Sequence, residues 1–351
     1  MNSLNSPRIG TSPLPVIPLP IIPLVDLGAE GLHVLAQRMP EKVRLLAKAG
    51  RNLLSGPVLG FMDRRSRVWL ARNETPYRAE IEAVAAIPGV SGAHGLNLSP
   101  EWACTSATAD GRLVRLLDWP IHGLGGAITV VGHQSPAGPW FNVTWPGFVG
   151  VLTGMAPGRF AIAYNQAPIR WASGVWPLDW LIERIRIGRH RGLPATHLIR
   201  RALETCPDFA TAFRFLKETP IAYTGLITIA GANGEAAIIE RAEDLAYVHE
   251  GPGAIPNHWL NPHWRGHPRG IDSPGRLAQC HVLVPDLRSL GTDFGWLKYP
   301  MLNKLSRLAV IADLKTGDLA VLGLEQDGRS AKPATECFKI NVLQKNIAVT
   351  A

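Results

Sequence analysis

Cysteine is scarce in this chain of 351 residues. The four cysteines stand at positions 104, 206, 280 and 337. They are too few and too widely spaced for a disulfide framework, and no Cys-x-x-Cys pair suggests a zinc site. We therefore expect the protein to work in a reducing compartment.

Long uninterrupted apolar runs are also absent. The apolar stretch at 14–27 is broken by four prolines and lacks a basic start close before it, so it does not resemble a secretory signal peptide. No run of about 20 apolar residues is available to form a membrane-spanning helix. These absences predict a cytoplasmic protein, with peripheral contact to the inner membrane face as one option.

Acidic residues are outnumbered, 28 against 36 Lys and Arg, which gives a formal net charge of +8. The basic residues do not alternate with aromatic residues in a nucleic-acid-binding pattern, so we expect no nucleic acid partner. The excess is concentrated at residues 38–72, which hold nine Lys or Arg and only Glu41 and Asp63 as acids. Apolar residues recur there at helical spacing, from about residue 29 to 72. Basic helices of this kind either lie on an anionic membrane or pack on the protein with a solvated basic face.

The composition and the apolar pattern of the sequence change along the chain and indicate three regions. Residues 1–27 form a proline-rich arm, residues 28–103 a helical segment, and residues 104–351 an α+β body. A further helix is expected near 75–87. In the body we expect strands, then helices, then strands again, which argues against a parallel Rossmann sheet. The expected strands are 104–109, 112–118, 127–132, 139–145, 148–152, 159–165, 221–230, 236–241, 245–249, 305–314, 319–324 and an edge strand at 338–343; the expected helices are 177–189, 194–206, 208–218 and 273–283.

Cys104 begins the first expected strand. A turn at Asp110-Gly111 would bring Arg115 and Asp118 on the next strand back beside the sulfur, and these are the parts of an activated thiol. If the bond between Ala103 and Cys104 were cut, the new α-amine could act as the base for the thiol, because its pKa is about 7.7–8.0. The alternative is that Cys104 is an ordinary buried strand residue.

Several separated motifs resemble one enzyme family. The run Trp145-Pro146-Gly147 through Arg159-Phe160 leads to Tyr164-Asn165-Gln166. With Cys104-Thr105-Ser106 and Arg115-x-x-Asp118, it resembles the acid ceramidase and N-acylethanolamine acid amidase family, within the choloylglycine hydrolase group of N-terminal-nucleophile hydrolases. Further similar stretches occur in the same order at 76–87, 198–220, 257–259 and 302–305.

This resemblance implies an αββα sandwich made as a precursor that cuts itself before Cys104. Residues 1–103 would remain as a helical subunit and 104–351 would carry the catalytic sheets. The family hydrolyses linear amide bonds of fatty-acyl amides such as ceramide or N-acylethanolamine, with no metal and no other cofactor. Two alternatives remain: an acylase for other N-acyl amides, such as N-acyl amino acids, acyl-homoserine lactones, penicillins or bile-salt conjugates, and an uncut relative that binds lipid.

The resemblance also assigns roles to residues. Cys104 matches the nucleophile, while Arg115 and Asp118 match charged residues that would favour the thiolate and hold the α-amine. Asn165 and Asn257 match two asparagines of the oxyanion hole. As alternatives, Arg115 and Asp118 could form a surface ion pair, Asn165 could end a strand and Asn257 could belong to a turn.

The sequence departs from the family at several positions. Gln166 stands where the family has glutamate, and His258 where it has tyrosine. A later arginine of the family corresponds to Arg276 or, less well, to Arg269. Trp145, Phe148, Met155 and Trp259 are candidates for an acyl-chain pocket or for the core.

Overall fold

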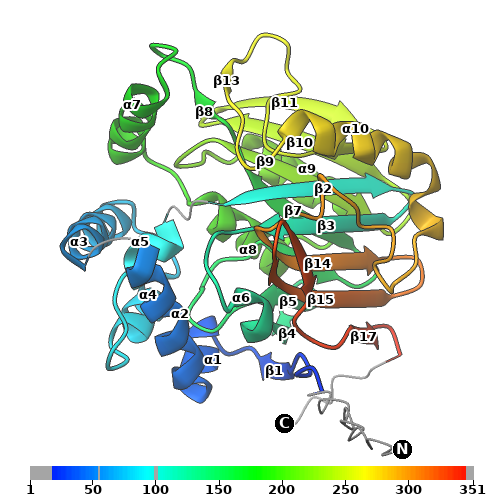
Figure 1. Ribbon diagram of the computed structural model, residues 1–351, viewed down its shortest axis with the longest axis horizontal. Coiled ribbons are helices and arrows are strands. Elements are labelled where there is room, and N and C mark those ends of the chain that lie inside the picture. The colour runs from blue at the N-terminus through cyan, green and yellow to red at the C-terminus, as the bar shows by residue number, and fades with distance from the viewer. Residues whose placement is uncertain (1–17, 54–55, 99–101, 345–351) are drawn as a thin grey trace, which may run out of the picture.

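Two β-sheets stacked face to face form the centre of the computed structural model, which describes residues 18–53, 56–98 and 102–344 (Figure 1). One sheet has eight strands in the order β1-β4-β5-β6-β7-β9-β10-β11. Contacts such as Ser106 Oγ to Thr228 Oγ1, at 2.7 Å, join the two sheets directly. The strands of the first sheet are Leu24–Gly28 (β1), Thr129–Ser135 (β4), Gly138–Thr144 (β5), Thr153–Ala156 (β6), Phe160–Gln166 (β7), Gly225–Gly231 (β9), Ala236–Ala242 (β10) and Leu245–Glu250 (β11).

The second sheet has the order β12-β2-β3-β14-β15-β16, and β17 also pairs with β15. Its central strands β2 and β3 are buried along their whole length, because both faces of the sheet are covered. A separate pair of short strands, Ile169–Arg170 (β8) and Gly266–His267 (β13), lies outside the two sheets. The strands of the second sheet are Gly253–Ile255 (β12), Ala103–Ala109 (β2), Arg112–Asp118 (β3), Ser306–Asp313 (β14), Asp318–Asp327 (β15), Ser330–Pro333 (β16) and Phe338–Asn341 (β17).

Helices cover the outer faces of both sheets. Ala195–Thr205 (α8) and Phe209–Glu218 (α9) pack on the eight-stranded sheet, and Ser273–Leu283 (α10) with the 3₁₀ helix Val284–Ser289 packs on the other sheet. The resulting helix, sheet, sheet, helix layers confirm the predicted αββα sandwich. Trp176–Arg189 (α7) stands apart from these layers (Figure 1).

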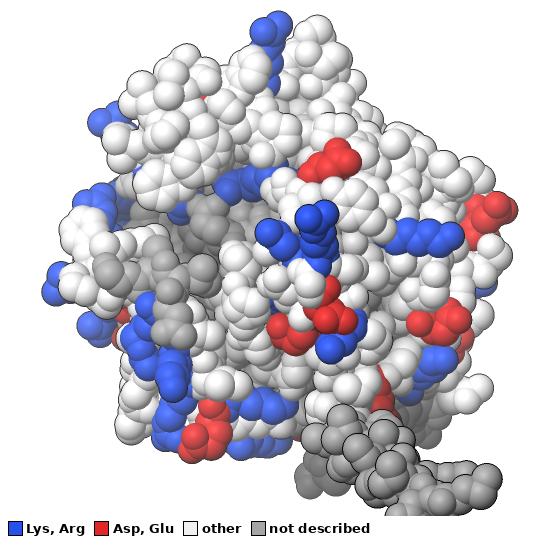
Figure 2. Space-filling view, viewed as in Figure 1, with Lys and Arg blue, Asp and Glu red and all other residues white. Residues whose placement is uncertain are grey.

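The N-terminal helices share the core of the sandwich instead of forming a separate unit. Val43, Trp69 and Ile81 belong to the same buried cluster as Cys104 and Leu117. Figure 2 shows Lys and Arg side chains gathered over the region of α1 and α2. These helices are Leu32–Arg38 (α1), Pro40–Leu53 (α2), Gly56–Arg72 (α3), Arg78–Ala85 (α4) and Ala93–Leu98 (α5); a short helix, Leu124–Ala127 (α6), lies in the body.

The end of the proline-rich arm is a strand. Leu24 and Val25 of β1 pair in parallel with Val130 and Val131 of β4, so this segment forms one edge of the eight-stranded sheet. Residues 1–17 of the arm lie outside the described residues. The sequence showed the extended character of the arm but not its partner.

The strand expected at 148–152 is wrong. These residues form a buried loop whose backbone groups bond to other elements: the Val149 nitrogen donates to Asn97 Oδ1 at 2.6 Å, and the Val151 nitrogen donates to the Thr196 carbonyl at 3.0 Å. Because these backbone groups are already bonded, they pair with no strand, and the strand begins at Thr153. Among the described helices, none is both long and apolar enough to cross a bilayer.

Candidate active site

The β2–β3 hairpin brings Arg115 to the sulfur of Cys104, as predicted. Arg115 lies opposite Ser106, two residues beyond Cys104, so the side chains of all three residues share one face of the sheet. Arg115 Nη2 donates a hydrogen bond to Cys104 Sγ at 2.8 Å. The same guanidinium is held by the Tyr164 carbonyl at 2.9 Å and by Thr153 Oγ1 at 2.7 Å. Strands of both sheets therefore fix the cation beside the thiol.

Burial nevertheless acts against the thiolate form of Cys104. Cys104 has no exposed surface. Burial raises the pKa of Cys104, and the opposing effect of Arg115 does not overcome it. Arg115 thus favours the thiolate in the predicted direction, but in this structure burial has the larger effect on the pKa of Cys104.

Asn257 holds the backbone nitrogen of Cys104. That nitrogen donates to Asn257 Oδ1 at 2.7 Å, and Asn257 Nδ2 donates to the Gln166 carbonyl at 2.7 Å. The amide oxygen thus faces the atom that would become the α-amine after a cut. This arrangement fits a residue that orients the amine, whereas the resemblance had assigned Asn257 to the oxyanion hole.

Arg276 binds the backbone carbonyl of Cys104. Its Nη1 donates to the Cys104 carbonyl at 2.5 Å, to Thr105 Oγ1 at 2.9 Å and to Asn257 Oδ1 at 3.1 Å. Arg269 is linked to Cys104 through Arg276 in these contacts. Its carbonyl accepts a hydrogen bond from Arg276 Nη2, and its own Nε donates to the Ala167 carbonyl. The geometry therefore agrees with the preference for Arg276.

Asp118 lies next to the site, since it pairs with Ala103 across the hairpin. Its carboxylate accepts hydrogen bonds from Asn303 Nδ2 and Ser306 Oγ, both at 2.8 Å. Burial raises the pKa of Asp118, although Arg276 opposes the shift. The carboxylate makes no hydrogen bond to the nitrogen of Cys104 in the uncut chain, where that nitrogen bonds to Asn257.

Asn165 is not aimed at the sulfur. Its Nδ2 donates to the Ile255 carbonyl at 2.7 Å, to Ser106 Oγ at 3.0 Å and to the Pro256 carbonyl at 3.2 Å. Asn165 of β7 thus connects Ser106 of β2, two residues beyond Cys104, with Ile255 at the end of β12. The oxyanion role expected for Asn165 stays a prediction.

Two supporting residues were missed in the sequence. Ser273 Oγ accepts from the Asn257 nitrogen at 3.1 Å and contacts His258 Nδ1 at 2.8 Å, so it positions the loop that carries Asn257. Asn303 holds Asp118 and lies in one of the stretches that resemble the family. That stretch was the one available signal for Asn303, while Ser273 carried no signal beyond its place after the helix-capping Asp272.

Trp102, two residues before Cys104, belongs to the same buried cluster as the cysteine. The Trp102 nitrogen donates to Gln166 Oε1 at 2.9 Å. The indole of Trp102 packs edge-on against Trp119, Phe148 and Tyr164, with ring centroids 5.3, 6.2 and 6.1 Å away. Gln166, which stands where the family has glutamate, therefore holds the backbone at Trp102, just before strand β2.

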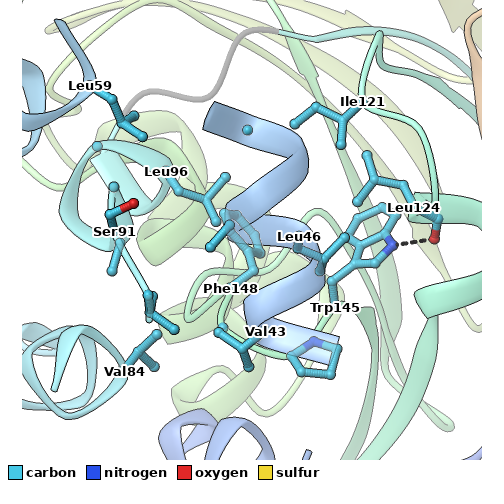
Figure 3. Close-up of a pocket in the computed structure, with 18 of the residues that line it drawn as sticks. Val43, Leu46, Leu59, Val84, Ser91, Leu96, Ile121, Leu124, Trp145 and Phe148 are labelled. Carbon is cyan, nitrogen blue, oxygen red and sulfur yellow. Dashed lines mark hydrogen bonds between the residues drawn. The ribbon is translucent and has the colours of Figure 1, made fainter. Parts of the chain in front are cut away.

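An apolar pocket of about 300 Å³ lies beside this aromatic cluster (Figure 3). Its walls come from α2, α3 and α5 on one side and from the body on the other, and Trp119 and Phe148 link it to Trp102. Trp145 also lines it and donates its indole N–H to the Leu124 carbonyl at 2.8 Å. Of the four aromatic and Met candidates, Trp145 and Phe148 line this pocket, whereas Met155 is in the core and Trp259 belongs to another cluster.

Within the described residues, no group of three His, Cys, Asp or Glu side chains could hold a metal ion.

Residues 184–281 match the family model of acyl-coenzyme A:6-aminopenicillanic acid acyl-transferase. The matched residues make up less than a third of the chain, and the αββα layers agree with the fold that the family resemblance implies. A comparison with curated proteins finds no match.

Solved structures of similar fold include three amide hydrolases. The N-acylethanolamine-hydrolyzing acid amidase ortholog of Caenorhabditis elegans has 17% identity and a TM-score of 0.44, covering 61% of this chain and 93% of its own. A conjugated bile acid hydrolase from Clostridium perfringens has 10% identity and a TM-score of 0.42, with coverage of 68% and 96%. Penicillin V acylase from Agrobacterium tumefaciens has 12% identity and a TM-score of 0.36, with coverage of 69% and 86%.

Proposed function

We propose that this chain is a cysteine amidohydrolase that cuts itself before Cys104 and then hydrolyses N-acyl amides with an apolar acyl chain. One observation carries the proposal: the thiol and the backbone nitrogen of Cys104 are each held by a dedicated partner, Arg115 and Asn257. A plain core cysteine needs neither contact.

Self-cleavage would begin when Cys104 Sγ attacks the Ala103 carbonyl. The S–C bond forms, the peptide C–N bond breaks, and the thiol proton passes to the released nitrogen. Water then hydrolyses the thioester and leaves residues 1–103 with a new carboxylate. The freed amine, oriented by Asn257, would serve as the base for the thiol in later turnovers.

Turnover would repeat this chemistry on an external amide. The amine takes the thiol proton, sulfur attacks the substrate carbonyl, and the ammonium returns the proton to the leaving amine. Water releases the acyl group from the thioester. The Asn165 amide could donate to the oxyanion only if it exchanges its present hydrogen bonds after the bond before Cys104 is cut.

Intact mass of the purified protein tests self-cleavage. We expect two pieces divided between Ala103 and Cys104, which remain associated because the helices before the cut share the core with the sheets. A single uncut mass after incubation at mildly acidic and neutral pH would contradict the proposal and would favour an uncut lipid-binding protein.

The pocket in Figure 3 is the proposed acyl site. Trp102 packs against the same Trp119 and Phe148 rings that line the pocket, so its departure after cleavage would open a path from the sulfur to this space. Apolar walls select an apolar chain, and the fatty-acyl amides of the ceramide or N-acylethanolamine kind fit this requirement. Other N-acyl amides with a long apolar acyl group are the second candidates.

A bulky residue in this pocket should discriminate acyl lengths. We expect Leu46→Trp to raise KM about tenfold or more for long-chain amides and to leave short-chain amides nearly unchanged, because Leu46 lines the pocket. The matched control is Leu45→Trp, since Leu45 is the next residue and faces solvent. Hydrolysis of a series of amides of increasing acyl length measures the effect. Equal loss on short and long substrates would place the acyl chain elsewhere.

A further inference from the structure

One short segment connects the two residues that hold the backbone of Cys104. The Arg269 nitrogen donates to the Asn257 carbonyl at 3.1 Å, and the Arg269 carbonyl accepts from Arg276 Nη2 at 2.8 Å. Asn257 in turn binds the Cys104 nitrogen, and Arg276 binds the Cys104 carbonyl. We call residues 267–270 the bracing segment, because a shift of this segment would move both contacts to Cys104.

The bracing segment is held by a very short strand pair. Its first residue, His267, ends β13, which pairs with β8 over two residues and places His267 opposite Ile169. A strand pair of this length is not stable without other contacts. At its other end the segment lies against the bond to be cut, since a Cβ atom at Gly270 would stand 2.5 Å from Ala103 Cβ. The position of the segment therefore depends on what holds His267.

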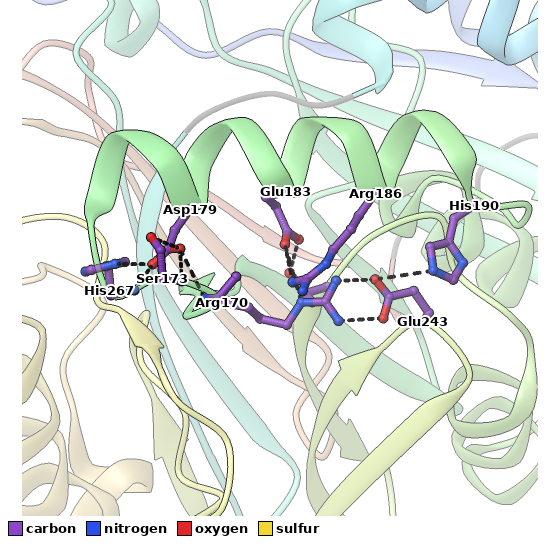
Figure 4. Close-up of polar contacts among 11 residues, drawn as sticks. Arg170, Ser173, Asp179, Glu183, Arg186, His190, Glu243 and His267 are labelled. Atoms are coloured by element: carbon purple, nitrogen blue, oxygen red, sulfur yellow. Dashed lines mark hydrogen bonds and ion pairs between the residues drawn. The ribbon is translucent and has the colours of Figure 1, made fainter.

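A buried carboxylate on α7 holds His267 (Figure 4). Asp179 Oδ2 lies 2.9 Å from His267 Nε2, and Asp179 has no exposed surface. The Asp179 carboxylate also accepts hydrogen bonds from three backbone N–H groups of the loop 172–174, at 2.7–3.1 Å, and from Ser173 Oγ at 2.8 Å. Burial acts to raise the pKa of Asp179, but the hydrogen bonds from Ser173 and His267 outweigh burial and lower the pKa. Asp179 is therefore an ionised anchor at neutral pH.

A second anchor holds α7 itself. Arg170 Nε contacts Glu183 Oε2 at 3.3 Å, and the two Nη atoms of Arg170 bind both oxygens of Glu243 in the β10–β11 turn (Figure 4). Large apolar side chains on the opposite side of α7 face outward. Because α7 keeps this second anchor, we expect that the contact between Asp179 and His267 can be broken without releasing the helix. The particular effect of that contact is to hold the bracing segment.

We propose that Asp179 and His267 form a positioning pair for the amidohydrolase reaction. The pair acts through the bracing segment, which aligns Asn257 and Arg276 on the backbone of Cys104. This inference rests on the proposed function. A displacement of about 1 Å at a reacting group can lower a rate by about a hundredfold. The described residues that line the acyl pocket all lie between positions 43 and 148, so loss of the pair should lower kcat without raising KM.

Asp179→Asn tests the pair in the self-cleaving chain, because it keeps the size of the side chain and removes its charge. We expect kcat for a fatty-acyl amide to fall about tenfold or more, with KM within about twofold of wild type, and self-cleavage to slow by a similar factor. His267→Phe should behave alike, whereas His267→Gln retains a side-chain N–H donor and should keep more activity. The double variant Asp179→Asn/His267→Phe should lose no more than the weaker of the two single variants, because the two residues act as one unit.

The matched control is Glu243→Gln. It removes a charge from the other ion-pair network of Figure 4 and leaves Glu183 as a partner of Arg170. This variant should lower the melting temperature, as Asp179→Asn does, but leave kcat within about twofold of wild type. Equal loss of kcat in Asp179→Asn and Glu243→Gln would reduce Asp179 to a residue of general stability and overturn the proposal. Losses that multiply in the double variant would do the same.

Amide exchange gives a readout that needs no turnover. In the uncut Cys104→Ala chain, the backbone N–H of position 104 should still donate to Asn257 Oδ1. We expect Asp179→Asn, added to this chain, to speed deuterium exchange at position 104 about tenfold and Glu243→Gln to leave it unchanged. An unchanged exchange rate with Asp179→Asn would overturn the positioning role. If the wild type proves uncut and inactive, the proposed function fails, while exchange at position 104 still decides whether the pair positions Asn257.

Discussion

Replacing the sulfur should abolish both activities proposed for this chain: Cys104→Ala is expected to stay in one piece and to lose amide hydrolysis by about 10⁴-fold or more. Removing a covalent nucleophile has effects of this size in other hydrolases. The variant should still fold, because alanine fits within the space of the buried cysteine and leaves the Asn257 and Arg276 contacts to the backbone in place. Intact mass and an N-acyl amide assay measure the two losses.

The control is Cys206→Ala. Cys206 is also buried, but it ends α8 far along the chain from the hairpin. We expect this variant to be cut and to turn over substrate like wild type. A Cys104→Ala chain that remains uncut yet fully active would rule out the mechanism, and one that is cut normally would show that another group performs the cleavage.

Acid should destabilise the folded protein through two buried histidines. Burial lowers the pKa of both His133 and His197 from 6.5 to about 3, and Arg200 adds to the shift. Between pH 6.5 and 3 the unfolded chain therefore binds protons on these residues that the folded chain does not. Stability falls as the pH decreases through this window and is unaffected by these groups above it. At pH 5 each histidine should cost about 2 kcal/mol relative to pH 7.

Denaturant unfolding at several pH values measures this loss. His133 stacks on Trp140, with ring centroids 4.1 Å apart, so His133→Phe keeps the stack and removes the titration. We expect the pH dependence of stability to become shallower in this variant between pH 7 and 5. His94 contributes to the pH dependence of stability in the opposite direction. Its pKa is raised, because Asp63 and Glu82 outweigh the effect of burial. Comparing the variant with wild type cancels this contribution, since both chains contain His94. An unchanged slope in His133→Phe would show that His133 is already protonated in the folded chain.

The sequence by itself determined the local elements, while the family resemblance pointed to Cys104 as the candidate nucleophile. The turn at Asp110-Gly111 between two short strand-like runs was enough to predict the β2–β3 hairpin, and the pairing of its strands places Arg115 on the face of Cys104. The order of strands, helices and strands was enough to predict an α+β body, and the family resemblance implied the αββα sandwich. These features depend on neighbours close in sequence.

The tertiary structure decided the features that depend on contacts between distant residues. The segment 148–152 reads as a strand, but its backbone is bonded to Asn97 and Thr196, so its conformation is set by other elements. Asn257 was recognised as a site residue, yet only the position of its oxygen 2.7 Å from the Cys104 nitrogen shows what it holds. Likewise, the apolar residues of α7 would have been expected to face the core. They face outward because Arg170, His267 and Glu243, from separate parts of the chain, fix its carboxylate side.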